Sequence, residues 1–213
     1  VPVLSPRPRV MGGELLETHF EFDAASRTAL SRALKLRRTG FQPVQPDEQN
    51  GQDARSTVRV TVLTVAPRYA TDLLRRALAM GATDAALLET EDICGDIHGA
   101  ARLLADHIAM KLAKCDLVLC GDSILAAVLG GNLGMSHQSG VTEFAMADGR
   151  WSIWLEKTAV KLERDEPMVL GIVAGEARAE FSAGDSIAAL GKPLEIVDTR
   201  HVEAVPHFVT RYA

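Results

Sequence analysis

The feature that most constrains the fold is a short apolar run in the middle of the chain that ends abruptly in a glycine. Leu117 to Cys120 are four consecutive apolar residues, and Gly121, Asp122 and Ser123 follow them directly. Such a run is typical of a strand buried on both faces, as in a parallel sheet covered by helices. Ligands of such sheets bind at the carboxyl ends of the strands. Asp122 and Ser123 are therefore candidate ligand-binding residues, and an ordinary strand-to-helix turn is the alternative interpretation.

Segments typical of strands and helices alternate along most of the chain. The apolar patterns predict parallel strands at 1–4, 58–65, 85–88, 116–120 and 168–173, and helices at 24–38, 71–80 and 97–113. Asp23 suits the N-cap of the first helix, Thr71 or Asp72 that of the second, and Gly40 and Gly81 follow these helices. Strands joined by helices in this order predict an α/β fold with a doubly wound, mostly parallel Rossmann-like sheet. At 213 residues, a single domain covering residues 1–213 is expected.

The pattern changes in the second half of the chain. Residues 141–147 and 150–155 flank Asp148-Gly149, a strong signal for a two-residue hairpin, and 158–163 could extend this ribbon. We expect the antiparallel ribbon to lie outside the parallel sheet. Trp151 and Trp154 should face opposite sides of their strand, so that one of them is exposed or at an interface.

The sequence also predicts the structure of several shorter segments. The proline and arginine run 6–9 predicts an irregular crossing segment, and the polar stretch 42–57 predicts an exposed loop. Residues 186–190 favour a short helix and 194–197 a last strand. The tail 200–213 contains more apolar residues than a free tail needs, which indicates packing on a partner.

Composition and charge disfavour several classes of function. A net charge of −5 argues against nucleic acid as the main partner, and no apolar run approaches the roughly 20 residues of a membrane span. No signal peptide is visible at the start. The three cysteines, Cys94, Cys115 and Cys120, lack paired spacing, which fits a cytoplasmic protein. The six histidines form no metal-like cluster, and His107 is interpreted as a partly solvated helix residue without a catalytic role.

No motif of catalysis stands out. The chain has no nucleophile elbow, no Walker loop and no cysteine–histidine pairing with a positioned base, so an enzyme is not expected. Gly130, Gly131 and Asn132 belong to a glycine-rich stretch that could hold a phosphate at a helix start. Close packing is the alternative explanation for this glycine pair, and the one that we favour.

The segment 67–89 resembles the beta subunit of electron-transfer flavoproteins. Its most specific part is Arg76-Ala-Leu-Ala-Met-Gly-Ala82. Phe22-Asp23 before an alanine- and leucine-rich helix, and Asp116-Leu-Val-Leu-Cys-Gly121, fall where that family has similar stretches. Order and spacing agree from about residue 20 to residue 197, which is most of the chain.

The resemblance implies an adenine-nucleotide alpha-hydrolase-like fold and an electron-carrying role. In that family the beta subunit pairs with an alpha subunit that carries FAD, and itself holds AMP or a second FAD. The pair relays electrons from a flavin dehydrogenase to an acceptor. The alternatives are an adenine-nucleotide-binding protein and a structural subunit that has lost its nucleotide. The expected cofactor-binding residues are Phe22, Asp23, Val65, Ala66, Gly121, Asp122, Ser123, Gly130, Gly131 and Asn132.

Two departures from the family pattern change what we expect. After Gly121 the family has an aspartate-rich turn and a Gln/Thr-Gly helix start, whereas 123–130 is shorter here and lacks both. AMP binding should therefore be weak or absent. The family's docking loop corresponds to 179–187, and its leucine position is Gly184 here. We therefore expect no docking of acyl-CoA dehydrogenases.

Overall fold

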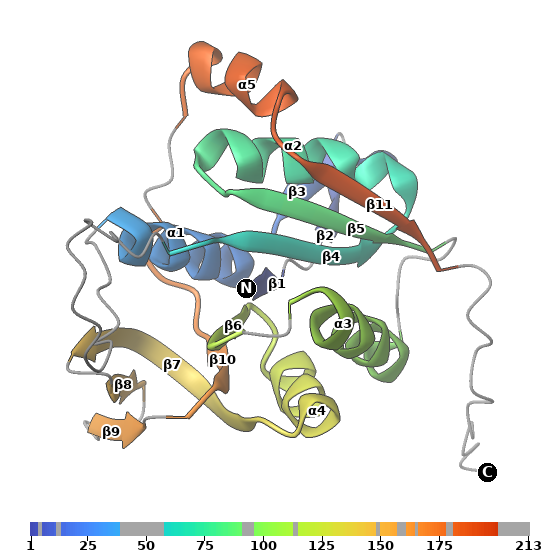
Figure 1. Ribbon diagram of the computed structural model, residues 1–213. Coiled ribbons are helices and arrows are strands. Elements are labelled where there is room, and N and C mark those ends of the chain that lie inside the picture. The colour runs from blue at the N-terminus through green and yellow to red at the C-terminus, as the bar shows by residue number, and fades with distance from the viewer. Residues whose placement is uncertain are drawn as a thin grey trace, which may run out of the picture.

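A nine-stranded sheet runs through the computed structural model, with helices on both of its faces (Figure 1). The structure describes residues 1–3, 6–11, 14–38, 58–90, 96–112, 115–147, 150–156, 161–164, 166–177 and 181–199. The expected loop at 42–57 and the partner-binding tail at 200–213 therefore lie outside the described residues.

Seven of the strands are parallel, and they form the centre and one edge of the sheet. The order across the sheet is β11-β5-β4-β1-β6-β10-β7-β8-β9, with every neighbouring pair from β11 to β7 parallel. Their bounds are β1 (Pro2–Val3), β4 (Thr61–Ala66), β5 (Asp84–Glu89), β6 (Leu117–Cys120), β7 (Ser136–Ala147), β10 (Met168–Ile172) and β11 (Leu194–Asp198). The prediction of a doubly wound, mostly parallel sheet is confirmed.

Helices cover the sheet because each of its faces is apolar. On one face α1 (Ala24–Arg38) and α2 (Thr71–Met80) bury leucines and alanines against β4, β5 and β10, and α5 (Ala183–Leu190) packs on α2. On the other face α3 (Ile97–Lys111) and α4 (Ser123–Leu133) pack against β1, β4 and β6. The central strands are therefore buried on both sides, as their unbroken apolar sequences predict.

The first two helices begin in different ways. The backbone N–H groups of Ala25 and Ser26 donate to Oδ1 of Asp23 at 3.0 Å each, which confirms Asp23 as a cap. A side-chain cap of α2 by Thr71 or Asp72 is wrong, because the 3₁₀ turn η1 (Arg68–Ala70) leads straight into that helix. α2 ends as expected at Gly81, whose φ of 123° suits glycine.

The proline-rich segment near the start is a strand, so the expectation of an irregular crossing there is wrong. β2 (Pro6–Met11) pairs antiparallel with β3 (Glu14–Phe22) in a separate two-stranded sheet, with Pro6 opposite Phe22. Each strand of such a ribbon has one unpaired edge. Proline can occupy a strand at that edge without removing a ladder hydrogen bond.

The hairpin forms as predicted, but it belongs to the main sheet. β7 pairs antiparallel with β8 (Arg150–Leu155), which pairs with β9 (Lys161–Arg164). β7 starts at Ser136, before the expected residue 141, and its first half pairs parallel with β10. The expectation that the ribbon lies outside the sheet is therefore wrong, because one long strand serves both parts.

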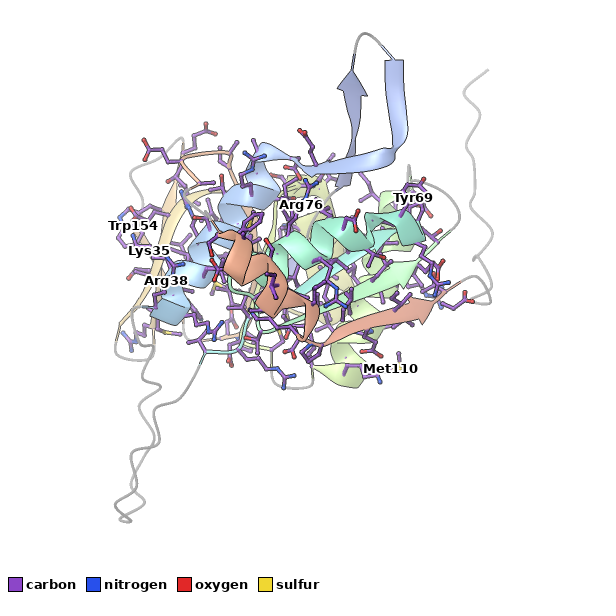
Figure 2. All side chains as sticks on the ribbon, turned by 90° about the horizontal axis from the view of Figure 1, so that it is seen from above. Lys35, Arg38, Tyr69, Arg76, Met110 and Trp154 are labelled. Atoms are coloured by element: carbon purple, nitrogen blue, oxygen red, sulfur yellow. The ribbon has the colours of Figure 1, made fainter. Side chains whose placement is uncertain are left out.

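The two tryptophans face opposite sides of β8, as expected. Trp151 is 5% exposed and lies edge-on to Phe144, with ring centroids 6.3 Å apart. Trp154 is half-buried and lies at one edge of the molecule, on the side of Lys35 and Arg38 (Figure 2). Trp151 is thus covered by its own chain and needs no partner for burial.

His107 is buried, so its interpretation as a partly solvated residue is wrong. Its side chain is 5% exposed on the side of α3 that approaches β11. Burial lowers the pKa of His107, while Glu195 raises it and Lys111 lowers it further. Lys111 and Glu195 themselves form an ion pair at 3.5 Å. Burial, the largest of these effects, therefore disfavours the charged form of the ring.

This burial predicts a pH dependence of stability. Because the pKa of His107 lies below its ordinary value of about 6.5, the unfolded chain binds the proton first as the pH falls. The contribution of His107 to stability is therefore full above about pH 6.5 and is lost as the pH falls through the folded pKa. In urea unfolding between pH 7 and pH 5, His107→Gln should lose less stability than the natural chain. The exposed His98→Gln should keep the natural slope, and equal slopes in all three proteins would contradict the prediction.

Candidate functional site

The connections of the sheet change direction between β1 and β6. From β1 the chain passes through α1 to β4, and from β6 it passes through α4 to β7 on the opposite side of the sheet. β1 and β6 are direct neighbours, with Val3 paired to Cys120. Figure 1 shows α1 and α4 on opposite faces beside these two strands. In doubly wound sheets, ligands bind in the crevice at such a switch point.

The start of α1 crosses the end of β6 at this crevice. A Cβ atom at Gly121 would lie 2.4 Å from the backbone nitrogen of Ser26 and 2.9 Å from the carbonyl carbon of Ala25. Only glycine allows this approach. The structure thus brings the predicted pair Phe22-Asp23, which precedes α1, close to the predicted residues Gly121, Asp122 and Ser123.

Carboxylates already cap both helices that begin here. Oδ1 of Asp122 accepts hydrogen bonds from the backbone N–H groups of Ile124 at 2.8 Å and Leu125 at 2.9 Å. Oδ1 of Asp23 does the same at the start of α1. Oδ2 of Asp23 is buried and has no hydrogen-bond partner among the described residues.

This capping decides which chemical groups the crevice can hold. Two N–H groups at each helix start already donate to a carboxylate, and a carboxylate repels an anion that approaches it. These bonds and charges disfavour a phosphate close to either carboxylate. A hydrogen-bond donor, such as a hydroxyl or amino group, fits the free oxygen of Asp23.

Residues that the sequence analysis did not identify also contact these segments. The N–H group of Gly175, after β10, donates to Oγ1 of Thr28 on α1 at 3.0 Å. Oγ of Ser139 donates to the carbonyl of Ser123 at 3.3 Å. A Cβ atom at Gly171 would lie 3.3 Å from Cα of Ser123. These contacts join segments far apart in the sequence, and no local motif indicates them.

Val65 and Ala66 lie at the same edge of the sheet but not beside Gly121. They end β4, and β1 lies between β4 and β6. One intervening strand corresponds to a separation of about 10 Å between β4 and β6. Both side chains are buried, at 7% and 1% exposure, so only their backbone faces the edge.

Gly130, Gly131 and Asn132 lie in the last turn of α4, at the opposite end of that helix from Asp122. The premise that they begin a helix is therefore wrong. The end of a helix leaves carbonyl groups free, and these do not bind phosphate. A Cβ atom at Gly130 would lie 2.9 Å from Cβ of His137, as expected from the packing interpretation. The structure does not bring these three residues together with Gly121.

The segment that corresponds to the docking loop is held firmly against α2. Ser182 and Asp185 form a capping box at the start of α5. Nη1 of Arg75 donates to the carbonyl of Ala189 at 2.8 Å, and Nζ of Lys192 donates to that of Leu78 at 2.7 Å. Each of the two helices therefore has its last carbonyls bonded by a cation from the other segment.

α5 and Phe181, which precedes it, have apolar side chains that face solvent. Phe181 is 39% exposed, Ile187 71% and Leu190 68%. Gly184 lies in the first turn of the same helix. The predicted helix started at residue 186, and the sequence analysis did not identify this exposed trio. Ile187 and Leu190 are three residues apart, a spacing that places them on one helix face.

No group of three or more histidine, cysteine, aspartate or glutamate side chains in the described ranges is placed to hold a metal ion. Within the same ranges, no helix has the length and apolar character needed to cross a membrane.

Comparison with known proteins agrees with this architecture. The model of the electron transfer flavoprotein domain matches residues 50–192, which is more than half of the chain. The electron transfer flavoprotein subunit beta of Megasphaera elsdenii is 37% identical over 76 residues. That match covers 33% of this chain and 28% of the length of the relative. The chain therefore belongs to the electron transfer flavoprotein domain family.

Proposed function

We propose that this chain is the beta subunit of a heterodimeric electron-transfer flavoprotein. It would relay electrons from a flavin dehydrogenase to an acceptor, through an FAD held mainly by an alpha subunit. The family match over residues 50–192 carries the proposal. The partial identity to a subunit named beta favours that subunit over its partner.

The chemistry at the crevice supports a carrier rather than a catalyst. Cys120, at the end of β6, directly precedes Gly121 of the crevice, and it is fully buried. Burial raises the pKa of Cys120 to about 12, so the group remains a neutral thiol at physiological pH. A thiol in this state is a poor nucleophile, and the cap aspartates are engaged with backbone N–H groups.

The proposed nucleotide contacts are Phe22, Asp23, Gly121, Asp122 and Ser123, with Val65 and Ala66 at the rim. Gly130, Gly131 and Asn132 stay outside this group because they lie at the other end of α4. With both helix starts capped, AMP should bind weakly or not at all. Of the two alternative functions, weak AMP binding favours a structural subunit that has lost its nucleotide over a dedicated adenine-nucleotide binder.

The proposed partners are an alpha subunit and a donor dehydrogenase. We propose that the donor contacts α5 through Ile187 and Leu190, which are largely exposed. Gly184 offers no apolar side chain at the family's leucine position, so acyl-CoA dehydrogenases are not the expected donors. The tail 200–213 remains a predicted contact with the alpha subunit.

Co-purification tests the proposal directly. The full chain, co-expressed with an alpha-type subunit, should purify as a yellow complex whose denatured extract contains FAD and no stoichiometric AMP. Mass spectrometry of the extract identifies the nucleotides. A chain that purifies alone with tightly bound AMP would contradict the proposal and support the adenine-nucleotide binder. A colourless chain that forms no such complex would also overturn it.

A further inference from the structure

The helix α5 is attached to the rest of the fold with little apolar burial. Figure 1 shows it outside α2, as an outer layer on that side of the sheet. Of its eight residues only Ala189 is buried, at 1% exposure. A single buried methyl group stabilises packing weakly, and a helix of this length is not stable in water by itself. Contacts other than apolar burial therefore hold α5 in place.

Arg75 on α2 supplies the first of these contacts. Its Nη1 atom donates to the carbonyl of Ala189 at 2.8 Å and to that of Lys192 at 3.1 Å, and it lies 3.4 Å from the carbonyl oxygen of Leu190. The last carbonyls of a helix have no acceptor role within it and are free for such bonds. A guanidinium group is always charged, and hydrogen bonds from charged donors are roughly twice as strong as neutral ones. The end of α5 is therefore fixed to the middle of α2.

Lys192 supplies the reciprocal contacts. Its Nζ atom donates to the carbonyls of Leu78 at 2.7 Å and Ala82 at 3.0 Å, at the end of α2. Burial lowers the pKa of Lys192, and the nearby charge of Arg37 lowers it further. The ammonium group has thus exchanged part of its water for these two carbonyls. Arg75 and Lys192 together form a clamp that joins the ends of α2 and α5 in both directions.

This clamp fixes the place of two exposed apolar side chains. Ile187 is 71% exposed and Leu190 68%, and both lie in the second half of α5. The carbonyl oxygens within reach of Arg75 include those of Leu190 itself and of its neighbour Ala189. An apolar surface binds a partner more tightly when its side chains and backbone are already ordered, because binding then does not have to order them.

We propose that Arg75 and Lys192 are positioning residues, which hold α5 on α2 so that Ile187 and Leu190 meet the donor dehydrogenase as one fixed apolar surface. The inference rests on the proposed function, in which a donor contacts α5. Neither cation takes part in electron transfer. Both act through the position of the helix, so their effect on the donor should disappear when the two apolar side chains are removed.

Amide hydrogen exchange of the full chain tests the attachment of α5 without any partner. In Arg75→Met and in Lys192→Met, the amides of residues 187–192 should exchange at least about tenfold faster than in the natural chain, because α5 opens more often. Arg75→Lys keeps a cationic donor and should restore most of the protection. The control Arg76→Met removes an exposed arginine of α2 and should leave exchange unchanged (Figure 2).

The amides of β4 and β6 report in the same experiment whether each variant is folded. They should keep their natural protection in all four variants, because these strands lie in the centre of the sheet. If α5 exchanged at the natural rate in Arg75→Met and in Lys192→Met, the clamp would not hold the helix, and the proposal would be overturned.

Steady-state reduction of the heterodimer tests the consequence for the donor. The probe is a purified flavin dehydrogenase that reduces the FAD of the natural heterodimer, found by screening such enzymes across substrate classes. Arg75→Met should raise the KM for the heterodimer by about tenfold and leave kcat unchanged, because it weakens the encounter and not the electron transfer. In a chain that carries both Ile187→Ala and Leu190→Ala, Arg75→Met should raise KM no further.

The possible results distinguish this inference from the proposed function. If no dehydrogenase reduces the natural heterodimer, the proposed function fails, and the inference fails with it. If the natural heterodimer and Arg75→Met are reduced with the same KM, only the inference fails. A lower kcat at an unchanged KM would also contradict it. An equal rise of KM in the chain without Ile187 and Leu190 would show that Arg75 does not act through these side chains, and would overturn its positioning role.

Discussion

Gly121→Ala is expected to lower the free energy of unfolding by about 3 kcal/mol, because the added methyl group has no space. It would lie 2.4 Å from the backbone nitrogen of Ser26 and 2.9 Å from the carbonyl carbon of Ala25. Both atoms belong to the first turn of α1, which Asp23 holds through two hydrogen bonds. Backbone fixed in this way cannot move as a flexible side chain would. Urea unfolding of the full chain measures the loss.

Gly131→Ala is the matched control for this change. No described atom outside its own helix and neighbouring residues lies within 4 Å of a Cβ atom at Gly131, which is exposed near the end of α4. Alanine favours a helix over glycine by up to about 1 kcal/mol, so this variant should be as stable as the natural chain or slightly more stable. Equal losses in the two variants would show that the approach of α1 to β6 is not what restricts residue 121.

The strands and helices of the central sheet could be predicted because their causes are local. Leu117 to Cys120 are apolar without interruption, since β6 is covered on both faces. Asp23 and Gly81 act on the backbone within a few residues of their own positions. The sequence therefore contains the whole explanation of these elements.

Features that depend on distant segments could not be predicted in this way. Whether the hairpin joins the main sheet depends on the pairing of β7 with β10, which local patterns do not reveal. The charge of Glu195 beside His107 and Lys111 depends on β11, an edge strand supplied by the end of the described chain. Thr28 and Gly175 meet only because α1 packs across the end of the sheet.

In the candidate site too, local features could be predicted, whereas features that depend on the three-dimensional structure could not. The glycine and aspartate after β6 were predicted to lie at the carboxyl edge of the sheet, and they do. The capping of both helix starts by Asp23 and Asp122 engages backbone N–H groups that a phosphate would use, and only the hydrogen-bond geometry reveals it. Gly130 was misplaced because a glycine-rich stretch suits either end of a helix.

Trp151→Ala is expected to lower the free energy of unfolding of the isolated chain by about 4 kcal/mol. The indole is 5% exposed and belongs to the apolar core on the α1 side of the sheet. Its ring lies edge-on to that of Phe144, an arrangement that adds to the energy of burial. Truncation would leave a large cavity between the hairpin and α1, which the surrounding backbone could fill only in part.

Trp154→Ala provides the comparison within the same strand. Its side chain is half-buried on the opposite face of β8, so its removal should cost about 1 kcal/mol in the isolated chain. The residue type, strand and substitution are the same, and only the face of the sheet differs. Urea unfolding of both variants without any partner gives the two losses. If Trp151 required a partner subunit for its burial, the two losses in the isolated chain would be similar and small.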